Sequence, residues 1–302
     1  MYTVRDVGEI GLIARLRRQV RKTSSVRVGI GDDAAVLQHP AGAWLLLASD
    51  MLIEGTHFLR RDLPAEWIGW KALACNISDI AAMGGIPTFA VVSVGLPANL
   101  SVSFVKKIYE GINHLAKEFK VGIVGGDTNR ASQIVINLAL LGKARKNQVV
   151  YRKGAKKGDW IFTTGGLGGS FKSGKHLSFL PRLKESRYLV QNFHPNSMID
   201  ISDGLAADLW HILKESKVGA AIYEDRIPKN KKASLRQALY EGEDFELLFT
   251  LKPTNAKKLL RLKPKGLHFY CLGEIIKQPY ALYLVGRDGR RRKLKAFGFR
   301  HF

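Results

Sequence analysis

The order of apolar and polar positions divides the first half of the chain into alternating predicted strands and helices. Short apolar runs that end at glycine or a polar residue predict strands, and apolar residues spaced three or four apart predict helices. In 101–120, for example, Val105, Ile108, Ile112 and Leu115 share one helical face. The predicted strands cover 27–33, 43–50, 88–96, 121–127 and 132–142, and the predicted helices cover 64–85 and 101–120.

The second half resumes this alternation after a polar, basic and glycine-marked segment at 143–159. Because this segment interrupts the apolar pattern, we place a domain boundary in it, between residues 1–145 and 146–302. Mixed strands and helices in 302 residues indicate an α/β protein with mixed sheets in two domains. The predicted strands here cover 159–165, 198–202, 243–251 and 268–275, with a hairpin around 286–290, and the predicted helices cover 204–216, 254–262 and a segment after Pro181.

Composition places the chain among soluble globular proteins, with 46% hydrophobic and 25% charged residues. No apolar run reaches the roughly 18 residues that a membrane span needs. The first residues carry acids before their basic cluster and have no apolar core, so we expect no signal peptide. The two cysteines, Cys75 and Cys271, lie far apart and form no disulfide framework, which favours a reducing cytoplasm.

The charge of the chain is strongly positive. Its 48 Lys and Arg against 26 Asp and Glu give a net charge of +22, which favours anionic partners such as nucleic acid, membrane surfaces or phosphorylated metabolites. The basic clusters are scattered over 15–22, 143–146, 152–157 and 290–293 and form no nucleic-acid-binding motif. We therefore favour a solvated basic surface, with no membrane and no specific nucleic acid as partner.

Aspartates recur where predicted strands give way to turns. A single aspartate at such a place is usually a helix cap or a turn residue, but so many of them in a basic chain indicate a binding site. Carboxylates without His or Cys companions suit Mg²⁺, and Mg²⁺ with open positions is what a polyphosphate substrate needs. The pattern predicts a magnesium and nucleotide site at Asp32, Asp33, Asp50, Asp127, Asp200 and Asp203, with Asp79 on a helix.

The segment 169–176, GSFKSGKH, is close to the P-loop pattern of nucleotide-binding proteins. His176 replaces the hydroxyl residue that would bind Mg²⁺, and the glycine-rich part, 165–170, lies before the match. We therefore predict a flexible or phosphate-facing loop here and reject a P-loop.

Eight motifs in order resemble those of the thiamine-monophosphate kinases, in the superfamily of aminoimidazole ribonucleotide synthase: GIGDDAAV, SDMLIEGTHF, KALACNISDIAAMGG, VGGDTNR, YRKGAKKGDWIFTTGGLGGS, MIDISDGLAADL, GEDFELLF and GFRHF. The resemblance covers nearly the whole chain. It implies phosphorylation of thiamine phosphate to thiamine diphosphate by ATP, through direct in-line transfer assisted by several Mg²⁺ ions. It also implies a homodimer formed by pairing the N-terminal sheets, with ATP and metal on the N-terminal domain and a C-terminal domain that completes the cleft.

The same resemblance implies roles for individual residues. The catalytic ones would be Asp50, Asp127 and Asp203, which hold metal. The metal positions are Asp33, Ser49, Asp50, Asp79, Asp127, Asp200 and Asp203; the ATP contacts are Tyr109, Gly126, Asp127, Arg152 and Ser202; and the positions facing thiamine phosphate are His57, Glu243 and Phe299. Structural roles stay open for four of these: helix packing for Tyr109, a core histidine for His57, a C-terminal anchor for Phe299 and a helix cap for Ser202.

The chain departs from the family pattern at two positions. Ala48 stands where a hydroxyl residue is usual, and Glu241 replaces the first glycine of the common GGED. Neither change removes a carboxylate from the predicted site. Two rival functions remain: another ATP-using member of the superfamily, such as a purine-pathway enzyme, a selenide-activating enzyme or a hydrogenase maturation factor, and a non-enzymatic polyphosphate or nucleic-acid binder. Dense acidic motifs argue against the second rival, because they repel a phosphate backbone.

Overall fold

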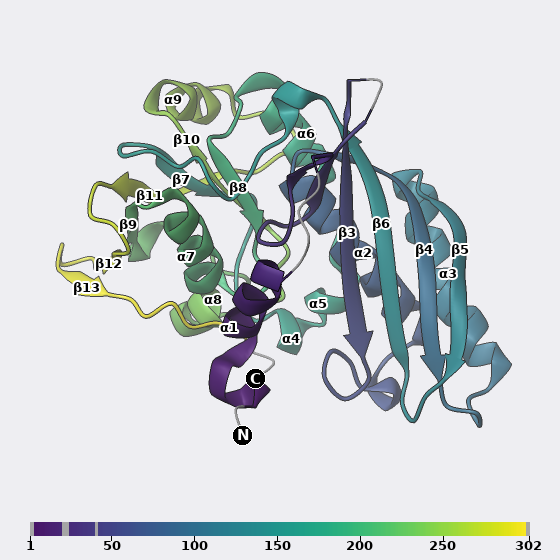
Figure 1. Cartoon of the computed structure of the whole chain (residues 1–302). Coiled ribbons are helices and arrows are strands. Elements are labelled where there is room, and N and C mark those ends of the chain that lie inside the picture. The colour runs from purple at the N-terminus through teal and green to yellow at the C-terminus, as the bar shows by residue number, and fades with distance from the viewer. Residues whose placement is uncertain (1–2, 20–23, 40–41, 300–302) are drawn as a thin grey trace.

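A computed structural model of the chain describes residues 3–19, 24–39 and 42–299, so 300–302 of the terminal motif and 20–22 of the first basic cluster lie outside it. The first half forms a six-stranded sheet in the order β1-β2-β3-β6-β4-β5 (Figure 1). Its strands are antiparallel except for the pair β4 and β5, so the sheet is mixed. The strands are β1 (Val26–Val28), β2 (Ala35–Gln38), β3 (Trp44–Ile53), β4 (Ile86–Leu96), β5 (Gly122–Arg130) and β6 (Val135–Ala144).

Two helices, α2 (Ala65–Ala82) and α3 (Val102–Phe119), cover one face of this sheet (Figure 1). They cross closely because each presents a glycine to the other's backbone. A Cβ on Gly69 would lie 1.9 Å from the carbonyl oxygen of Ile108, and a Cβ on Gly111 would lie 1.8 Å from that of Glu66. α2 is buried almost all round, since its other side packs against elements of the second half. It therefore joins the two halves of the molecule.

The second half forms a seven-stranded mixed sheet in the order β13-β12-β9-β11-β7-β10-β8. Helices bury both of its faces. α7 (Leu205–Ser216) and α8 (Leu235–Tyr240) pack on one face, while α6 (Leu183–Asn192) and α9 (Pro253–Leu262) pack on the other. The strands are β7 (Trp160–Thr163), β8 (Ser197–Asp200), β9 (Gly219–Tyr223), β10 (Leu247–Leu251), β11 (Tyr270–Ile276), β12 (Leu282–Val285) and β13 (Arg291–Lys293).

The mixed α/β class that the sequence predicts is confirmed, and the division near residue 145 stays a prediction. Several ends and elements differ from the prediction. β3 continues past Asp50 to Ile53, and β5 runs through its glycines to Arg130, so neither Asp50 nor Asp127 ends a strand. The sequence analysis did not predict α1 (Val4–Gln19), α4 (Ser170–Ser173), α5 (Lys175–Ser178), α8, β2 or β9. In the part of the chain that the structure describes, no helix is long and apolar enough to span a membrane.

The outer face of the N-terminal sheet, opposite α2 and α3, carries large apolar side chains in the open. Leu47, Met51, Phe89, Val91 and Val124 are each between 41% and 63% exposed. Alternation along the strands sends their neighbours, such as Leu46 and Val92, into the core. An apolar sheet face of this kind is typical of a surface that another protein covers.

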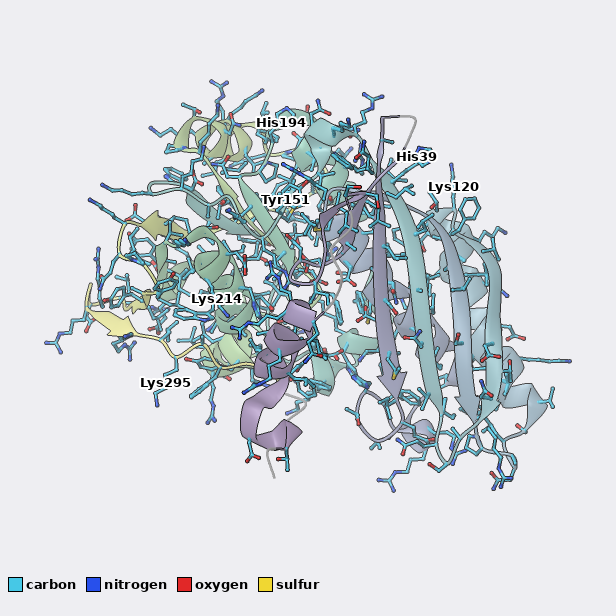
Figure 2. All side chains as sticks on the ribbon, in the orientation of Figure 1. His39, Lys120, Tyr151, His194, Lys214 and Lys295 are labelled. Atoms are coloured by element: carbon cyan, nitrogen blue, oxygen red, sulfur yellow. The ribbon has the colours of Figure 1, made fainter. Side chains whose placement is uncertain are left out.

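The basic residues lie on elements throughout the molecule (Figure 2). Lys120 follows α3, Lys214 lies on α7 and Lys295 follows β13. This distribution agrees with a solvated basic surface and does not favour one dedicated polyanion-binding face.

Candidate active site

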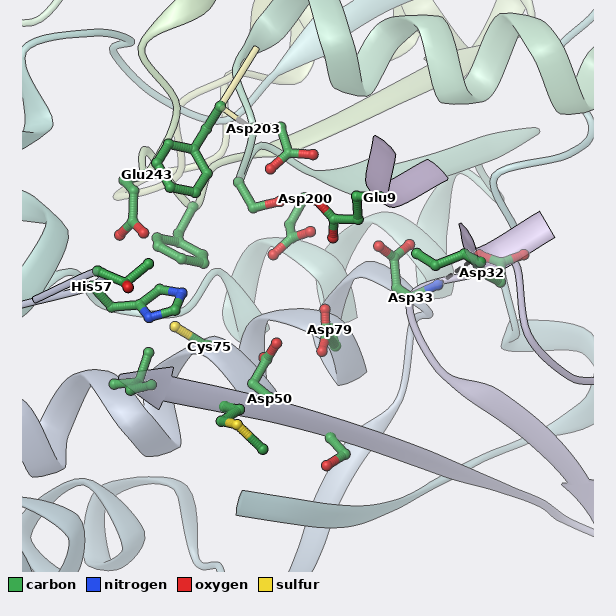
Figure 3. Close-up of a pocket in the computed structure, with 18 of the residues that line it drawn as sticks. Glu9, Asp32, Asp33, Asp50, His57, Cys75, Asp79, Asp200, Asp203 and Glu243 are labelled. Carbon is green, nitrogen blue, oxygen red and sulfur yellow. Dashed lines mark hydrogen bonds between the residues drawn. The ribbon is translucent and has the colours of Figure 1, made fainter. Parts of the chain in front are cut away.

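A cavity of about 780 Å³ lies between the N-terminal sheet and the second half of the chain (Figure 3). β3 contributes Asp50 to its wall, α2 contributes Asp79 and the end of β8 contributes Asp200. Ser202 and Asp203 follow in the turn that leads into α7. Segments that are far apart in the sequence therefore bring their acidic residues to one place.

The centre of the cavity is an acidic cluster. Carboxylate oxygens of Asp33, Asp79 and Asp200 lie within 4.8 Å of one another. Asp50 lies on the same cavity wall, where its charge raises the pKa of Asp79, and Ser78 donates a hydrogen bond of 2.6 Å to Asp200. The structure thus brings together Asp33, Asp50, Asp79 and Asp200, all of which the sequence analysis places in a metal site.

Burial and mutual repulsion raise the pKa values of Asp50, Asp79 and Asp200. Burial is the main cause at Asp50, where the pKa rises to about 6, and at Asp200, where burial and the charge of Asp33 raise the pKa to about 7. Burial also raises the pKa of Asp79 well above its ordinary value, with Asp50 and Asp200 adding to the effect. A group of buried acids whose charges oppose one another is suited to a cation.

Arg152 is the cation that faces this cluster in the described cavity lining. Its guanidinium donates a hydrogen bond of 2.8 Å to Oδ1 of Asp33, and its backbone N–H donates to Asp32. The other oxygen of Asp33, Oδ2, is buried and has no hydrogen-bond partner in the described structure. A buried carboxylate oxygen without a partner is costly, and a hard divalent cation such as Mg²⁺ would satisfy it. The donor set, carboxylate and hydroxyl oxygens, fits that ion.

One end of the cavity carries His57 and Glu243 (Figure 3), and Phe245, two residues after Glu243, also lines the cavity. Nδ1 of His57 accepts a hydrogen bond of 3.0 Å from the backbone N–H of Ile53, so the neutral ring carries its hydrogen on Nε2. Phe245 stacks on Phe179 with ring centroids 3.9 Å apart. This end therefore offers an aromatic surface, an N–H donor and a carboxylate.

Phe299 and Ser202 both line the main cavity. The backbone N–H of Phe299 donates to the carbonyl oxygen of Asp203, which fixes the last described segment against the turn before α7. The alternative role of Ser202 as a helix cap is wrong, because α7 begins at Leu205 with Gly204 as its cap residue.

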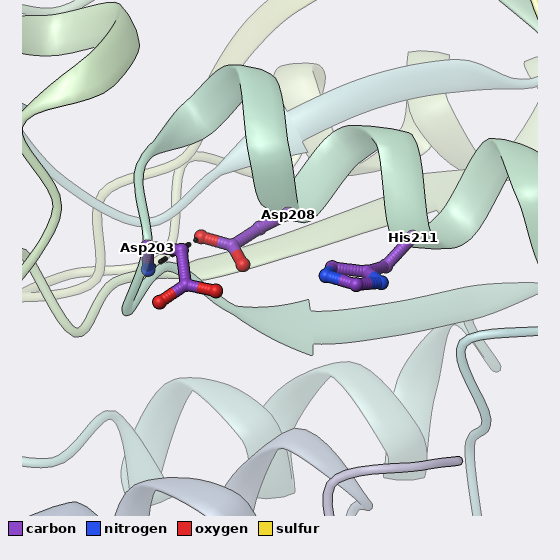
Figure 4. Close-up of side chains that lie close together, drawn as sticks. All are labelled: Asp203, Asp208 and His211. Carbon is purple, nitrogen blue, oxygen red and sulfur yellow. Dashed lines mark hydrogen bonds between the residues drawn. The ribbon is translucent and has the colours of Figure 1, made fainter. Parts of the chain in front are cut away.

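Asp203 also belongs to a second group, with Asp208 and His211 of α7 (Figure 4). Asp208 accepts hydrogen bonds from the backbone N–H groups of Asp203 and Gly204, at 3.1 and 3.0 Å. Burial lowers the pKa of His211 to about 4, so its ring is neutral at physiological pH. The group holds the turn that presents Ser202 and Asp203 to the cavity.

Tyr109, Gly126 and Asp127 do not line the cavity. Asp127 lies in the edge strand β5, three strands away from β3, which is about 14 Å at the usual spacing. Across the sheet, Asp127 pairs with Ser93, and this row of paired residues continues to Met51 on the outer face. Asp127 therefore points to the outer face, whereas Asp50, next to Met51, points to the side of the helices. Tyr109 packs against the hydrophobic core from α3, which supports a packing role.

Ser49 lies beside Met51 on the outer face of β3 and reaches the rim of the cavity. Its hydroxyl lies 3.3 Å from the side-chain oxygen of Asn137. Two residues of the site are not among those that the motifs predict. Glu9 of α1 adds a carboxylate to the cavity wall, and Lys71 of α2 lies behind the wall and binds Glu243. A lysine inside the apolar stretch WKALAC is the sequence signal for this pair, because a lysine that is buried needs an acidic partner.

The glycine-rich loop before α4 does not face a phosphate. The backbone N–H of Gly168 donates to Asp244, and that of Gly169 donates to Glu241. Lys175, the lysine of the P-loop-like segment, donates to Gly166 and to the fully buried Glu246. The phosphate-facing interpretation of this loop is therefore wrong, and the rejection of a P-loop is supported.

We expect Lys175→Ala to keep turnover within a few-fold of the wild type and to lower the melting temperature. Glu246 would lose one of its two cations and keep Arg182, which binds it through two hydrogen bonds of 2.7 Å. Loss of a hydrogen bond to a buried charge costs about 1.5–3 kcal/mol. Thermal melting and turnover at saturating ATP measure both effects, with the exposed Lys172→Ala as control. A loss of turnover as large as that of a cavity aspartate variant would revive the P-loop interpretation.

Comparison with known proteins assigns the chain to a family. The model for the N-terminal domain of AIR synthase related proteins matches residues 31–144, and the model for their C-terminal domain matches residues 156–284. A thiamine-monophosphate kinase from Buchnera aphidicola subsp. Schizaphis graminum is 34% identical, over 98% of this chain and 99% of that protein. The thiamine-monophosphate kinase from Escherichia coli K12 is also 34% identical, over 98% of each chain.

Solved structures agree with these matches. The structure of AaThiL complexed with AMPPCP and TMP has a TM-score of 0.86 and 30% identity, and covers 100% of this chain and 99% of that one. The HypE–HypF complex structure has a TM-score of 0.76 at 22% identity, which shows a shared fold alone. The chain belongs to the AIR synthase related family and, within it, to the thiamine-monophosphate kinases.

Proposed function

We propose that the protein transfers the γ-phosphoryl group of ATP to thiamine phosphate and so forms thiamine diphosphate. One observation carries this proposal: a chain that matches thiamine-monophosphate kinases over nearly its whole length gathers its aspartates in one cavity, with an aromatic and carboxylate end beside them.

The acceptor is a phosphate oxygen, which is already anionic near neutral pH, so the reaction needs no general base. The difficulty is to bring an anionic acceptor to the anionic γ-phosphate. Arg152 lies beside Asp33 and at the cavity wall, where it can bind a phosphate oxygen. Divalent cations held by the aspartates would offset the charges of both phosphates, so we expect catalysis to rest on positioning and charge neutralisation without a covalent enzyme intermediate.

Magnesium is the ion that we propose for this cluster. Asp33, Asp79 and Asp200 would hold it, with Asp50 and Asp203 nearby on the cavity wall. Bound Mg²⁺ supplies positive charge that offsets the charges of the phosphates. The partnerless Oδ2 of Asp33 supports this choice.

We further propose a homodimer that covers the apolar outer face of the N-terminal sheet. Two observations support it: the exposure of Leu47, Met51, Phe89, Val91 and Val124, and the position of Asp127 on that same face, away from its own cavity. We propose that Asp127 of one copy then serves the cavity of the other. Because both cysteines are free thiols, we expect the protein to work in a reducing cytoplasm.

We expect ADP release only with thiamine phosphate and a divalent metal. A coupled ADP-release assay with thiamine phosphate, free thiamine and purine-pathway intermediates tests this directly. Turnover of free thiamine at the same rate would contradict the proposed acceptor. Turnover of a purine intermediate in place of thiamine phosphate would assign the protein to a different activity of the same superfamily.

A further inference from the structure

Lys71 is among the largest fully buried side chains in the described part of the chain, and it ends in an amino group. It lies in the middle of α2 and is not part of the described cavity wall. Its ammonium group lies 2.5 Å from Oε2 of Glu243 and donates a longer hydrogen bond, of 3.4 Å, to the carbonyl oxygen of His57. One buried cation therefore joins two segments that line the same end of the cavity.

Glu243 sits in a backbone conformation that needs support. Its φ is 58°, in the left-handed region, and Phe245 follows with a φ of 50°. The backbone N–H of Glu243 donates to the carbonyl oxygen of Ser202, and that of Phe245 donates to the carbonyl oxygen of Ile201. These two bonds hold the segment in place. Strained backbone of this kind persists where the surroundings hold it, and it concentrates at functional sites.

The side chain of Glu243 is fixed through one oxygen only. Lys71 takes Oε2, and among the described residues no hydrogen bond to Oε1 is found. The carboxylate lines the cavity and is 13% exposed (Figure 3). A carboxylate held in this way presents a fixed acceptor to a ligand that carries an N–H donor.

The order of groups along the cavity decides which part of the ligand meets Glu243. In Figure 3, Asp33, which binds Arg152, lies toward one side of the cavity, Asp50, Asp79 and Asp200 lie in the middle, and His57 and Glu243 lie toward the other side. Phosphates must lie near the acidic cluster and its cations. The ring system of thiamine phosphate then extends toward His57, Phe245 and Glu243. Its aminopyrimidine ring carries the N–H donor that an oriented carboxylate accepts.

We propose that Lys71 is a positioning residue for the substrate: it holds Glu243 so that the free oxygen accepts a hydrogen bond from the amino group of the pyrimidine ring of thiamine phosphate. This inference rests on the proposed function and names the part of the substrate that Glu243 recognises. Lys71 acts through Glu243 and touches no substrate atom. The titratable groups near Lys71 are Asp50, Cys75 and His176, and the lysine acts to lower the pKa of each.

Lys71→Met tests the inference, because methionine keeps an unbranched side chain of similar length and removes the charge. We expect the affinity for thiamine phosphate, measured by calorimetry, to fall about tenfold or more, which is the scale of a hydrogen bond to a charged group. The Michaelis constant for ATP should stay within about twofold, since the ATP phosphates bind at the other end. Lys107→Met, which removes an exposed lysine that pairs with Glu66, is the matched control.

The double variant Lys71→Met/Glu243→Gln separates positioning from folding. Removing both members of a buried ion pair is often neutral for stability, whereas removing one is costly. We expect the double variant to melt near the wild type and still to bind thiamine phosphate weakly. Wild-type affinity in either folded variant would overturn the inference, as would equal losses for ATP and thiamine phosphate.

An analogue provides a second readout that a structural role would not move. Oxythiamine phosphate carries oxygen in place of the amino group of the pyrimidine. We expect the wild type to bind it more weakly than thiamine phosphate and Lys71→Met to lose this discrimination. Equal binding of both ligands by the wild type would overturn the assignment of Glu243 to the amino group. A wild type that binds neither ligand would overturn the proposed function together with this inference.

Discussion

Asp50→Asn is expected to reduce turnover about a hundredfold or more, the scale of losing one preorganised electrostatic contact, while the apo protein keeps or gains thermal stability. Asn preserves the shape of the side chain and removes its charge. Asp50 is buried and lies among carboxylates, so its charge is opposed both by burial and by its neighbours. A metal ligand cannot tolerate the change, because an amide oxygen is neutral. Asp203→Asn, in the turn before α7, should behave in the same way.

Asp127→Asn is expected to cause a similar loss although Asp127 is exposed and lies outside the cavity of its own chain. Its carboxylate accepts hydrogen bonds from the backbone of Thr128 and from Asn129, at 2.8 and 2.6 Å, and an amide oxygen can accept these as well. The melting temperature of the Asp127→Asn variant should therefore equal that of the wild type. The loss would arise because Asp127 serves the cavity of a partner chain.

Mixing the two inactive variants gives a direct test of this arrangement. If each site takes Asp50 from one chain and Asp127 from the other, half of the dimers in an equal mixture are mixed, and each mixed dimer has one intact site. Turnover should recover to about a quarter of the wild type after subunit exchange. Asp225→Asn, which changes an exposed aspartate of the second half, is the control. No recovery from a mixture that does exchange subunits would place Asp50 and Asp127 in the same chain's site or assign Asp127 another role.

The sequence predicts the pieces of this site better than it predicts their arrangement. The aspartates of the cavity could be identified because hard oxygen ligands recur beside apolar segments. Their mutual distances could not, because Asp33, Asp79 and Asp200 meet only after α2 packs between the two halves of the molecule. The period-two pattern places Asp50 and Asp127 on strands, but their faces depend on strand register, which pairs Asp127 with Ser93.

Two local errors have clear physical causes. The glycines in 121–127 predict the end of a strand, yet β5 continues to Arg130. Gly126 is needed there because a Cβ would lie 1.8 Å from the carbonyl oxygen of Val92. The apolar pattern does not predict α1, because its apolar residues Ile10, Ile13 and Leu16 do not form a helix face that packs on the core, and they remain exposed.

The apo protein is expected to lose thermal stability as the pH rises from about 4 to about 7, and Mg²⁺ is expected to restore it at the higher pH. Folding raises the pKa of Asp50 to about 6 and the pKa of Asp200 to about 7, chiefly through burial. A carboxyl group whose pKa is raised on folding binds its proton more tightly in the folded state. Its contribution to stability is therefore present at low pH and disappears as the pH rises through 6 to 7.

Each pKa unit corresponds to about 1.4 kcal/mol, so such a group contributes several kcal/mol at low pH that the apo protein loses by pH 8. For a chain of this size, about 1 kcal/mol shifts the melting temperature by about 2–4 °C. Bound Mg²⁺ replaces the lost protons as the positive charge of the cluster. Its stabilising effect should therefore be large at pH 8 and small near pH 5.5, where protons compete for the same oxygens.

Melting temperatures with Mg²⁺ and with a chelator, at both pH values, measure this prediction. The difference between the two conditions at one pH is the useful quantity, because the net charge of +22 also changes with pH and acts on both samples alike. Asp79→Asn should raise the apo melting temperature at pH 8 and reduce the response to Mg²⁺, since it removes one of the opposing charges. If Mg²⁺ raised the melting temperature equally at both pH values, or equally in Asp79→Asn and the wild type, the ion would bind elsewhere and the acidic cluster would have to be explained without it.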